Sequence, residues 1–428
     1  MSTNQLAPET VPQTIDNTKT AVPTKPSERI IALDALRGFA ILGILAMNIQ
    51  SFADILAAYA NPVAYENLIG LNKWIWILSH TFFSFKFMAL FAMMFGAGII
   101  LMTQCAEAKG VSPAKLHYRR NFWLLLFGLV HAYFVWMGDI LAIYAVCGFV
   151  VYIFRKRSPR LLIIIGLILL AIPSVMSIAG SAALPSLPVE IVAELKHQWG
   201  PPAEIVADEI ASYQGGWWQQ MRYRVPQSLE MHIFVFVVFS LWRVCGLMLW
   251  GMALFKLGVF TAERSKSFYG RFVLFGFLAG FPLVIYGIAQ NFAHDWDFAY
   301  SMFIGTQFNY WGSLFVSLGY IGMVMFIAKS EWMPKVVNRF AAVGRMALTN
   351  YFMQTIICTT IFYGHGLGLF GQVERTGQVL IVLVVWAFQL IVSPLWLDHY
   401  RFGPFEWLWR SLTYWKLQPM RKLQTAQG

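Results

Sequence analysis

A histidine and an aspartate lie eight residues apart in the apolar stretch 119–148. His131 falls inside the first of two apolar runs, and Asp139 follows Gly138 at the turn between them. Ionisable side chains are costly at membrane depth, so each one there is a candidate functional residue. Eight residues of straight helix span about 12 Å, which prevents contact unless the chain bends at Gly138. Two interpretations stay open: a general base or proton carrier beside an orienting acid, and a histidine that hydrogen-bonds to a neighbouring helix.

Two cations lie deep in apolar runs: Lys86, six residues after His80, and Arg243. A buried Lys or Arg requires an acid, a set of carbonyl oxygens or an anionic ligand. Asp139 and Glu230 are the candidate partners of Lys86 in a structural ion pair. As a functional residue, Lys86 would stabilise an oxyanion or bind an anionic head group.

Three arginines lie at the ends of apolar runs. Arg37 follows Asp34 by three residues, and Arg119 and Arg120 precede the run that contains His131. One hypothesis is a phosphate site shared by the three arginines, because the guanidinium fork matches phosphate geometry. The alternatives are an interfacial ion pair of Asp34 with Arg37, and arginines that only anchor a membrane span.

Asn350 and Gln354 are four residues apart and share a helix face. Buried amides either hold helices together or bind substrate, and the first role is the commoner one. The sequence contains no His and Cys spacing typical of a metal site, no phosphate-binding glycine loop and no Gly-x-Ser-x-Gly elbow. We therefore predict no metal site.

Membrane helices must position these residues. Of the 428 residues, 58% are hydrophobic and 12% charged, against about 45–50% and about 25% in soluble domains. The apolar residues fall in long runs, and apolar runs of roughly 18 or more residues can cross the hydrocarbon core as helices. We predict an all-α polytopic bundle of about ten transmembrane helices, at residues 33–52, 74–102, 121–137, 140–154, 161–180, 229–255, 272–291, 301–328, 346–363 and 378–397. The net charge of +11 then reflects membrane topology, and no nucleic-acid partner is predicted.

Most of the 32 Lys and Arg residues fall in segments on the side of the N-terminus, which predicts that both termini lie inside. The predicted organisation is a disordered cytoplasmic tail (1–28), an N-terminal five-helix half (29–180), an extracytoplasmic insertion (181–228), a C-terminal five-helix half (229–398) and a cytoplasmic amphipathic tail (399–428). In the last segment Glu406 and Arg410 could pair. That helix either lies on the inner membrane surface or packs on the cytoplasmic face of the bundle.

Several sequence blocks resemble the YeiB family of bacterial inner-membrane proteins, whose C-terminal half is a domain of unknown function. The matching blocks are Arg29-x4-Asp34-x2-Arg37-Gly38, Lys86-Phe87 with Phe95-Gly96-Ala97-Gly98, Gly128-Leu129-x-His131, Gly138-Asp139-Ile140-Leu141, Gly344-Arg345-Met346-Ala347-Leu348-Thr349-Asn350-Tyr351-x2-Gln354 and Gly403-Pro404-x-Glu406-Trp407-Leu408-Trp409-Arg410. They cover both ends of the chain, and the insertion lies between them. The resemblance implies a multi-pass protein of the bacterial inner membrane.

The first half also resembles, more distantly, the transmembrane acyltransferase superfamily, which includes heparan glucosaminide acetyltransferases and sugar acyltransferases of bacterial envelopes. The shared features are the pair Arg37-Gly38 and a histidine at membrane depth, whereas a His-Asp pair next to the start of the chain is missing here. The resemblance implies acyl transfer from a cytoplasmic thioester, with acyl-CoA as the candidate donor, to an acceptor outside.

The first function hypothesis is accordingly a membrane acyltransferase. Arg37, Arg119 and Arg120 would hold the phosphates of the donor. His131 would act as general base for the acceptor hydroxyl or carry the acyl group itself, and Asp139 would orient it.

The second hypothesis is a transporter or lipid-handling protein. Lys86, Arg243, Asn350 and Gln354 would line its path for an anionic solute or lipid. The third is a structural membrane protein whose polar residues only hold helices together. The lipid bilayer is a partner in all three, and a small-molecule or lipid substrate in the first two.

Overall fold

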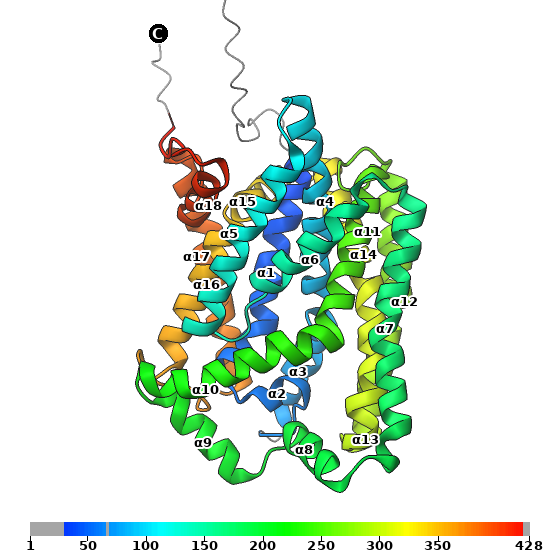
Figure 1. Cartoon of the computed structure of the whole chain (residues 1–428), viewed down its shortest axis with the longest axis vertical. Coiled ribbons are helices and arrows are strands. Elements are labelled where there is room, and N and C mark those ends of the chain that lie inside the picture. Colours follow the sequence, from blue (N-terminus) through cyan, green and yellow to red (C-terminus); the bar gives the residue numbers. More distant parts are fainter. Residues whose placement is uncertain (1–29, 66–67, 423–428) are drawn as a thin grey trace, which may run out of the picture.

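Helices form nearly all regular structure in the computed structural model, which describes residues 30–65 and 68–422 (Figure 1). The α-helices are α1 (Ile31–Ala53), α2 (Leu56–Ala60), α3 (Gly70–Phe82), α4 (Lys86–Ala108), α5 (Pro113–Phe134), α6 (Leu141–Val151), α7 (Pro159–Ala183), α8 (Val189–Trp199), α9 (Ala203–Gln214), α10 (Trp217–Glu230), α11 (Leu241–Lys256), α12 (Lys266–Ala293), α13 (Phe298–Tyr300), α14 (Thr306–Ser330), α15 (Pro334–Arg345), α16 (Ala347–Phe362), α17 (Arg375–His399) and α18 (Pro404–Tyr414). The predicted disordered tail 1–28 lies outside the described residues.

Seven helical stretches within the described residues are long and apolar enough to cross a membrane. They are Ile31–Ala53, Gly70–Ala108, Pro159–Ser186, Trp217–Lys256, Lys266–Ala293, Phe298–Ser330 and Arg375–His399. The prediction of an all-α polytopic bundle is confirmed. Helices α6 and α16 have 11 and 16 residues, fewer than the roughly 20 that cross the hydrocarbon core. The number of ten spans and the inward orientation of the termini therefore stay predictions.

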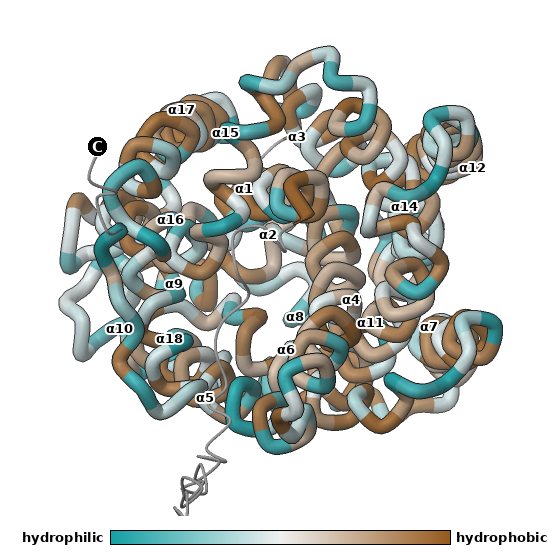
Figure 2. Tube along the Cα trace, turned by 90° about the horizontal axis from the view of Figure 1, so that it is seen from above, coloured by the Kyte–Doolittle hydropathy of each residue, from teal (hydrophilic) through white to brown (hydrophobic). Residues whose placement is uncertain are grey.

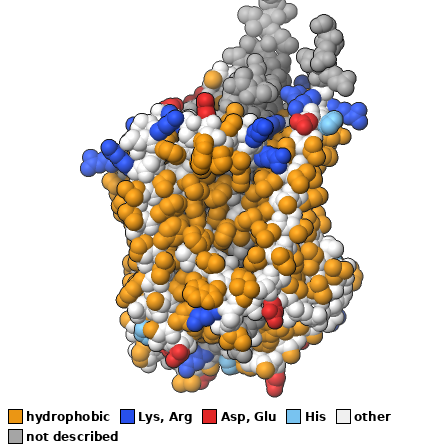
Figure 3. All heavy atoms as spheres, turned by 180° about the vertical axis from the view of Figure 1, so that it is seen from behind, with side chains coloured by type: hydrophobic (Ala, Val, Ile, Leu, Met, Phe, Trp, Pro, Cys, Tyr) orange, Lys and Arg blue, Asp and Glu red, His pale blue; other side chains and the backbone are white. Residues whose placement is uncertain are grey.

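Three helices expose their apolar side chains at the periphery of the bundle. Only 28%, 28% and 22% of the most apolar stretch is buried in α7, α12 and α17, against 72% in α1. Viewed along the long axis, α7, α12 and α17 lie at the outside and α1 lies further in (Figure 2). The apolar side chains form a broad belt between two ends that carry the charges (Figure 3). A belt of this kind is soluble in lipid rather than in water.

The two ends of the molecule differ in their elements. Helices α8, α9 and α10 cover one end, which we call the insertion end, and α18 lies at the other, which we call the basic end (Figure 1). Helix α18 packs on the bundle, where it contacts α5 and α16; its position relative to the membrane surface stays a prediction. Within the insertion, the sequence Gly215-Gly216 separates α9 from α10.

The expected span 74–102 falls within the single crossing stretch Gly70–Ala108, which consists of two helices. Helix α3 ends at Phe82, and α4 begins at Lys86 after Phe85 adopts a left-handed conformation with φ of 63°. The break lets the Lys86 ammonium reach back to the carbonyl oxygen of His80, at 2.7 Å. The mean hydropathy of the run does not predict this break, although Ser84 and Lys86 flank Phe85 there.

Helix α15 was not predicted, because its sequence reads as a polar connection. It packs tightly on α1 through two glycines. A Cβ at Gly38 would lie 1.8 Å from the carbonyl oxygen of Phe340, and one at Gly344 would lie 1.9 Å from that of Asp34. Glycine is thus required at both positions for the two backbones to touch. This contact brings Arg345 next to the start of α1.

Candidate functional site

His131 and Asp139 are in direct contact because the chain bends between them. Helix α5 ends at Phe134, and α6 begins at Leu141 after a turn. His131 Nδ1 lies 2.9 Å from Asp139 Oδ1. Asp139 Oδ2 accepts a hydrogen bond from the backbone N–H of Ala142 at 2.8 Å. Both ionisable side chains are fully buried, and the bend that their contact requires is present.

Gly128 explains how this turn reaches α5. A Cβ at Gly128 would lie 2.2 Å from the backbone N of Ala142 and 2.8 Å from Asp139 Oδ2. The start of α6 can therefore pack on α5 only where a side chain is missing. The spacing Gly128-x2-His131 thus has a packing cause. The start of α6 contacts α5 at Gly128, and His131, which contacts Asp139, lies one helical turn further along α5.

The second ring nitrogen of His131 faces a hydroxyl. Nε2 lies 3.0 Å from Thr355 Oγ1 in α16. Because the Asp139 carboxylate can only accept, Nδ1 carries the proton, and in the neutral ring Nε2 is then the acceptor. The rings of Tyr351 and Phe352 pack against the imidazole, each with a centroid distance of 5.1 Å. A ring whose tautomer is fixed by a buried acid is suited to act as a general base.

A cavity of about 300 Å³ lies at the basic end, between α1, α4, α5, α6, α15, α16 and α18. Its wall combines apolar side chains with a cluster of cations. The cations that line it are Arg37, Lys109, Arg120, Arg345, Arg401 and Arg410, and the acids are Asp34 and Glu406. This volume is at the lower end of the range for small-molecule sites, roughly 300–1,000 Å³.

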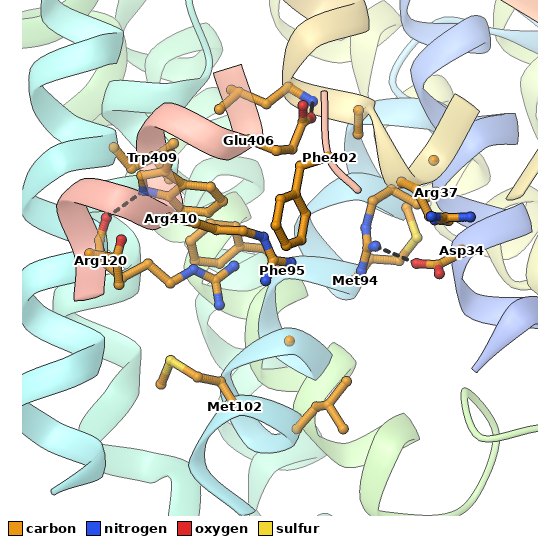
Figure 4. A pocket seen from close by; sticks show the side chains of 18 of the residues that line it. Asp34, Arg37, Met94, Phe95, Met102, Arg120, Phe402, Glu406, Trp409 and Arg410 are labelled. Atoms are coloured by element: carbon orange, nitrogen blue, oxygen red, sulfur yellow. Dashed lines mark hydrogen bonds and ion pairs between the residues drawn. The ribbon is translucent and has the colours of Figure 1, made fainter. Parts of the chain in front are cut away.

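Positive charge is in excess around the cavity. Six of the lining residues are Lys or Arg and two are acids, and one of these acids, Asp34, pairs with Arg37 at 2.7 Å. In Figure 4 Arg120 and Arg410 lie close together beside Phe95, and Arg37 and Asp34 lie on the other side of the view. Aromatic rings hold the guanidinium groups in place, since Arg120 lies 4.6 Å from the Trp409 ring centroid. Such a cluster suits a ligand that bears phosphate groups.

Helix α5 connects the cavity to the histidine. Arg120 and Leu124 line the cavity, and His131 follows Arg120 by eleven residues, which places both on nearly the same face, about 16 Å apart along the axis. Tyr351 lines the cavity and also contacts His131. Its hydroxyl lies toward the backbone of Ile140 but makes no hydrogen bond of good geometry within the described residues. Tyr351 thus stands between the cavity and the imidazole, which does not itself line the cavity.

The predicted arginine site is present in part. Arg37 and Arg120 line the cavity. Arg119 is not among the lining residues and lies 6.0 Å from the ring centroid of Trp415. The two neighbouring arginines therefore point in different directions, because successive residues of a helix are about 100° apart.

Lys86 pairs with neither Asp139 nor Glu230 among the described residues, which corrects the expected ion pair. Its ammonium donates to the carbonyl oxygen of His80 at 2.7 Å and to Asn309 Oδ1 at 2.6 Å. The helix break before Lys86 directs the side chain toward α14. The observed partners of Lys86 are thus a backbone carbonyl oxygen and a side-chain amide oxygen. Carbonyl oxygens are among the partners expected for a buried cation.

Arg243 is likewise buried without lining the cavity. Its guanidinium donates to the carbonyl oxygen of Tyr310 at 3.2 Å and to Ser313 Oγ at 2.8 Å. The Tyr310 and Phe85 rings lie 4.2 Å and 5.0 Å from it. These contacts join α11 to α14 and to the break before α4, so they account for the arginine structurally.

Asn350 and Gln354 make hydrogen bonds between helices. Asn350 Nδ2 donates to Ser393 Oγ in α17 at 3.1 Å. Gln354 Nε2 donates to Gln389 Oε1 in α17 at 2.9 Å and to the carbonyl oxygen of Ile41 in α1 at 3.1 Å. Their amides thus connect α16 to its neighbours, and neither lines the cavity.

Sequence reasoning missed the cavity residues that come from α15 and from the tail. Arg345, Arg401 and Arg410 belong to segments that read as a basic connection and a surface helix. Glu406 contacts the start of α16, which its spacing from Arg410 does not suggest. Its carboxylate accepts hydrogen bonds from the backbone N–H of Leu348 at 2.6 Å and from the N–H and hydroxyl of Thr349 at 3.1 Å and 2.5 Å. The block Gly403-Pro404-x-Glu406, which matches the family pattern, marks Glu406 in the sequence. The pattern does not indicate which groups the Glu406 carboxylate contacts.

Comparison with known proteins gives similar chains of nearly the same length. Residues 254–416 match a family described as "Protein of unknown function (DUF418)". The chain is 32% identical over 421 residues to "Uncharacterized protein YxaH" of Bacillus subtilis (strain 168), over 94% of this chain and 98% of that protein. It is 31% identical over 395 residues to "Uncharacterized protein YeiB" of Escherichia coli (strain K12), over 90% of this chain and 96% of that protein.

Proposed function

This chain belongs to the YeiB family, and we propose that it is a membrane acyltransferase that takes its acyl group from a thioester bound at the basic end. One observation carries the proposal. A single cavity at the basic end is lined by cations and also by Tyr351, whose ring contacts His131. A cation cluster binds the phosphates of the donor, and a buried histidine with an acid behind it supplies a base. On this proposal the basic end faces the cytoplasm of a bacterial inner membrane, which the distribution of Lys and Arg along the sequence supports.

The reaction requires only a base that later returns its proton. The acceptor hydroxyl attacks the thioester carbonyl while His131 Nε2 takes the hydroxyl proton. A C–O bond forms, the C–S bond breaks, and the leaving thiolate receives the proton from the imidazolium. Asp139 keeps Nδ1 protonated and stabilises the positive charge of the ring during this step. Nε2 now faces Thr355, so a rotation of the Thr355 or Tyr351 side chain must precede the reaction.

The transport hypothesis has less support from the geometry. The four residues assigned to an anion path make hydrogen bonds within the protein, and none of them lines the cavity. A path through them would require these interhelical bonds to break.

Binding and turnover of an acyl thioester test the proposal. Purified full-length protein in lipid nanodiscs is titrated with acetyl-CoA and a longer acyl-CoA, and release of free thiol is followed with and without envelope lipids and sugars. Arg120→Gln should weaken binding at least about tenfold, since an interaction with a charged group is worth roughly 1.5–3 kcal/mol. His131→Ala should abolish thiol release and leave binding within about threefold.

A matched control uses an arginine outside the cavity. Arg271 in α12 is exposed, and Arg271→Gln should bind the thioester as the unaltered protein does. Absence of binding by folded protein would refute the proposal. So would thiol release that survives His131→Ala.

A further inference from the structure

We propose that the tail of the chain, residues 400–422 with α18, is a lid that closes on the phosphate-bearing ligand of the cavity. We call this segment the tail lid. The inference rests on the proposed function for the identity of the ligand, but the hinge and the latch described below do not depend on it.

The tail lid forms one wall of the cavity. Its residues that line the cavity are Arg401, Phe402, Glu406, Trp409, Arg410, Thr413 and Tyr414. Without them the cavity would be an open groove between α1, α4 and α5. Trp409 in addition donates from Nε1 to the carbonyl oxygen of Arg120 at 3.0 Å, which seats the lid on α5 (Figure 4).

An anion in the cavity would join the lid to the bundle. The lid brings Arg401 and Arg410 to a cavity whose opposite wall carries Arg120. A phosphate group between the two walls can accept hydrogen bonds from arginines of both. Binding of the phosphate-bearing ligand therefore stabilises the closed position of the lid.

The tail lid can move as a unit because its two ends meet. The backbone N–H of Arg401 donates to the carbonyl oxygen of Met420 at 2.9 Å, and that of Lys422 donates to the carbonyl oxygen of His399 at 3.1 Å. Tyr400 and Arg421 form an antiparallel bridge. The returning chain is thus tied to the point where the lid leaves α17, so a rotation there moves α18 without stretching another connection.

A carboxylate latch holds the lid in place. Glu406 accepts three hydrogen bonds from the first turn of α16, through Leu348 and Thr349. The Thr349 hydroxyl also accepts from the backbone N–H of Phe405 at 3.1 Å. Gly403 permits this approach, because a Cβ there would lie 2.5 Å from Thr349 Oγ1. The latch places the Glu406 carboxyl at the first turn of α16, where backbone N–H groups lack intrahelical acceptors.

The position of the lid is coupled to the candidate catalytic histidine by packing through the ring of Phe352. Phe405 stacks on Phe352 with a centroid distance of 4.3 Å, and Phe352 packs edge-on against His131 at 5.1 Å. Opening of the lid therefore removes the packing behind the ring that holds the imidazole. A closed lid and an ordered His131 occur together, so acyl transfer requires closure.

Hydrogen exchange of the full-length protein in nanodiscs tests this device, with acetyl-CoA as the probe. At a probe concentration ten times the Kd, amide exchange in 404–414 should slow about tenfold, in proportion to 1 + [L]/Kd. Thr349→Val, which removes the shared hydroxyl but keeps the shape of the side chain, should speed exchange of the lid without ligand. Arg401→Gln with Arg410→Gln should weaken binding and lose the protection.

Arg421→Gln is the matched control, because this side chain lies in the same segment, is exposed and does not line the cavity. It should behave as the unaltered protein does. Probe binding with unchanged exchange in 404–414 would show a fixed wall and overturn the lid while the proposed function stands. No binding of the probe, combined with faster exchange in Thr349→Val, would overturn the proposed function and leave the hinged tail intact.

Discussion

Replacement of Asp139 by Asn tests the core of the proposed chemistry with almost no change of shape. The Ala142 N–H requires an oxygen at the position of Asp139 Oδ2, which now accepts it at 2.8 Å. The oxygen of the substituted amide must therefore take that position, and its NH2 group then faces His131 Nδ1. Nδ1 becomes an acceptor, and the ring proton moves to Nε2. The nitrogen that should act as the base toward the acceptor is then blocked.

The expected effect on the reaction is large and the effect on folding is small. Loss of a positioned general base costs about 10²–10⁴-fold in rate, or roughly 3–5 kcal/mol of barrier. Folding loses one charge-assisted hydrogen bond, which is worth about 1.5–3 kcal/mol, and regains part of it as a neutral bond from the substituted amide to the ring. The affinity for the donor should not change, because Asp139 does not line the cavity.

The assay compares thiol release, donor binding and thermal unfolding in the same nanodisc preparation. Asp295→Asn is the matched control, since Asp295 is exposed and its left-handed backbone, with φ of 47°, suits Asn as well as Asp. It should match the unaltered protein in all three measurements. Asp139→Asn should lose turnover and keep binding.

A turnover rate of Asp139→Asn within about threefold of the unaltered protein would refute the reasoning. The contact between His131 and Asp139 would then be one of the structural hydrogen bonds that join membrane helices. A variant that fails to fold would also contradict the small stability loss worked out above.

Three further predictions concern the framework around the site. Gly38→Ala should lower the unfolding temperature, because its Cβ would lie 1.8 Å from a carbonyl oxygen and overpacking costs about 1–3 kcal/mol; Gly270→Ala, with nothing within 4 Å, is its control. Lys86→Met should destabilise the protein by leaving Asn309 Oδ1 without its donor, and thermal unfolding should show partial recovery when Asn309→Leu is added. Burial raises the pKa of Glu406 above its ordinary value of 4.5. The protonated Glu406 carboxyl therefore stabilises the folded state below that value, and this contribution is lost as pH rises through the raised pKa. Amides of the lid should exchange faster at high pH after correction for intrinsic rates, and Glu406→Gln should remove this pH dependence.

Much of the fold follows from hydropathy alone. Long apolar runs predict membrane helices, and the positions of α1, α7, α12 and α17 agree with the runs at 33–52, 161–180, 272–291 and 378–397. The contact of His131 with Asp139 also follows in part, because Gly138 predicts a turn between them, although the helix in fact ends earlier, at Phe134. The break before Lys86 does not follow, since nothing in the sequence Ser84-Phe85-Lys86 requires Phe85 to take up its left-handed conformation.

The cavity could be predicted only in part, because its residues come from segments far apart in the chain. A shared phosphate site is one hypothesis for Arg37 and Arg120, whereas Arg345 and Arg410 each read as an ordinary basic residue next to a span. They meet because α15 packs on α1 through two glycines and because Glu406 anchors α18 at α16. Neither contact has a periodic signal in the sequence. The spacing of Glu406 and Arg410 does not reveal the contact with α16, because helix spacing says which residues of one helix can meet but not which tertiary partners they have.

The geometry of α5 sets a length requirement for the donor. Arg120 and His131 lie on nearly one face of the helix, three turns apart. The phosphate that Arg120 holds and the carbonyl that His131 serves must therefore be separated by on the order of 10–16 Å, allowing for the reach of the arginine side chain. In acetyl phosphate the two groups share an oxygen atom, so a molecule of that kind cannot occupy both positions.

We therefore expect a donor with a linker between phosphate and thioester to be used and a short acyl phosphate to be rejected. Rates of acyl transfer or hydrolysis are compared for acetyl phosphate, S-acetyl phosphopantetheine and acetyl-CoA with the same preparation. The second and third should react, and the third should bind more tightly because it has more phosphate groups for the cations of the cavity. Acetyl phosphate should neither react nor compete at concentrations that saturate the site with acetyl-CoA. Efficient use of acetyl phosphate would show that the acyl carbonyl does not need to extend from Arg120 to His131. The base or nucleophile of the reaction would then be a different residue, nearer the cations.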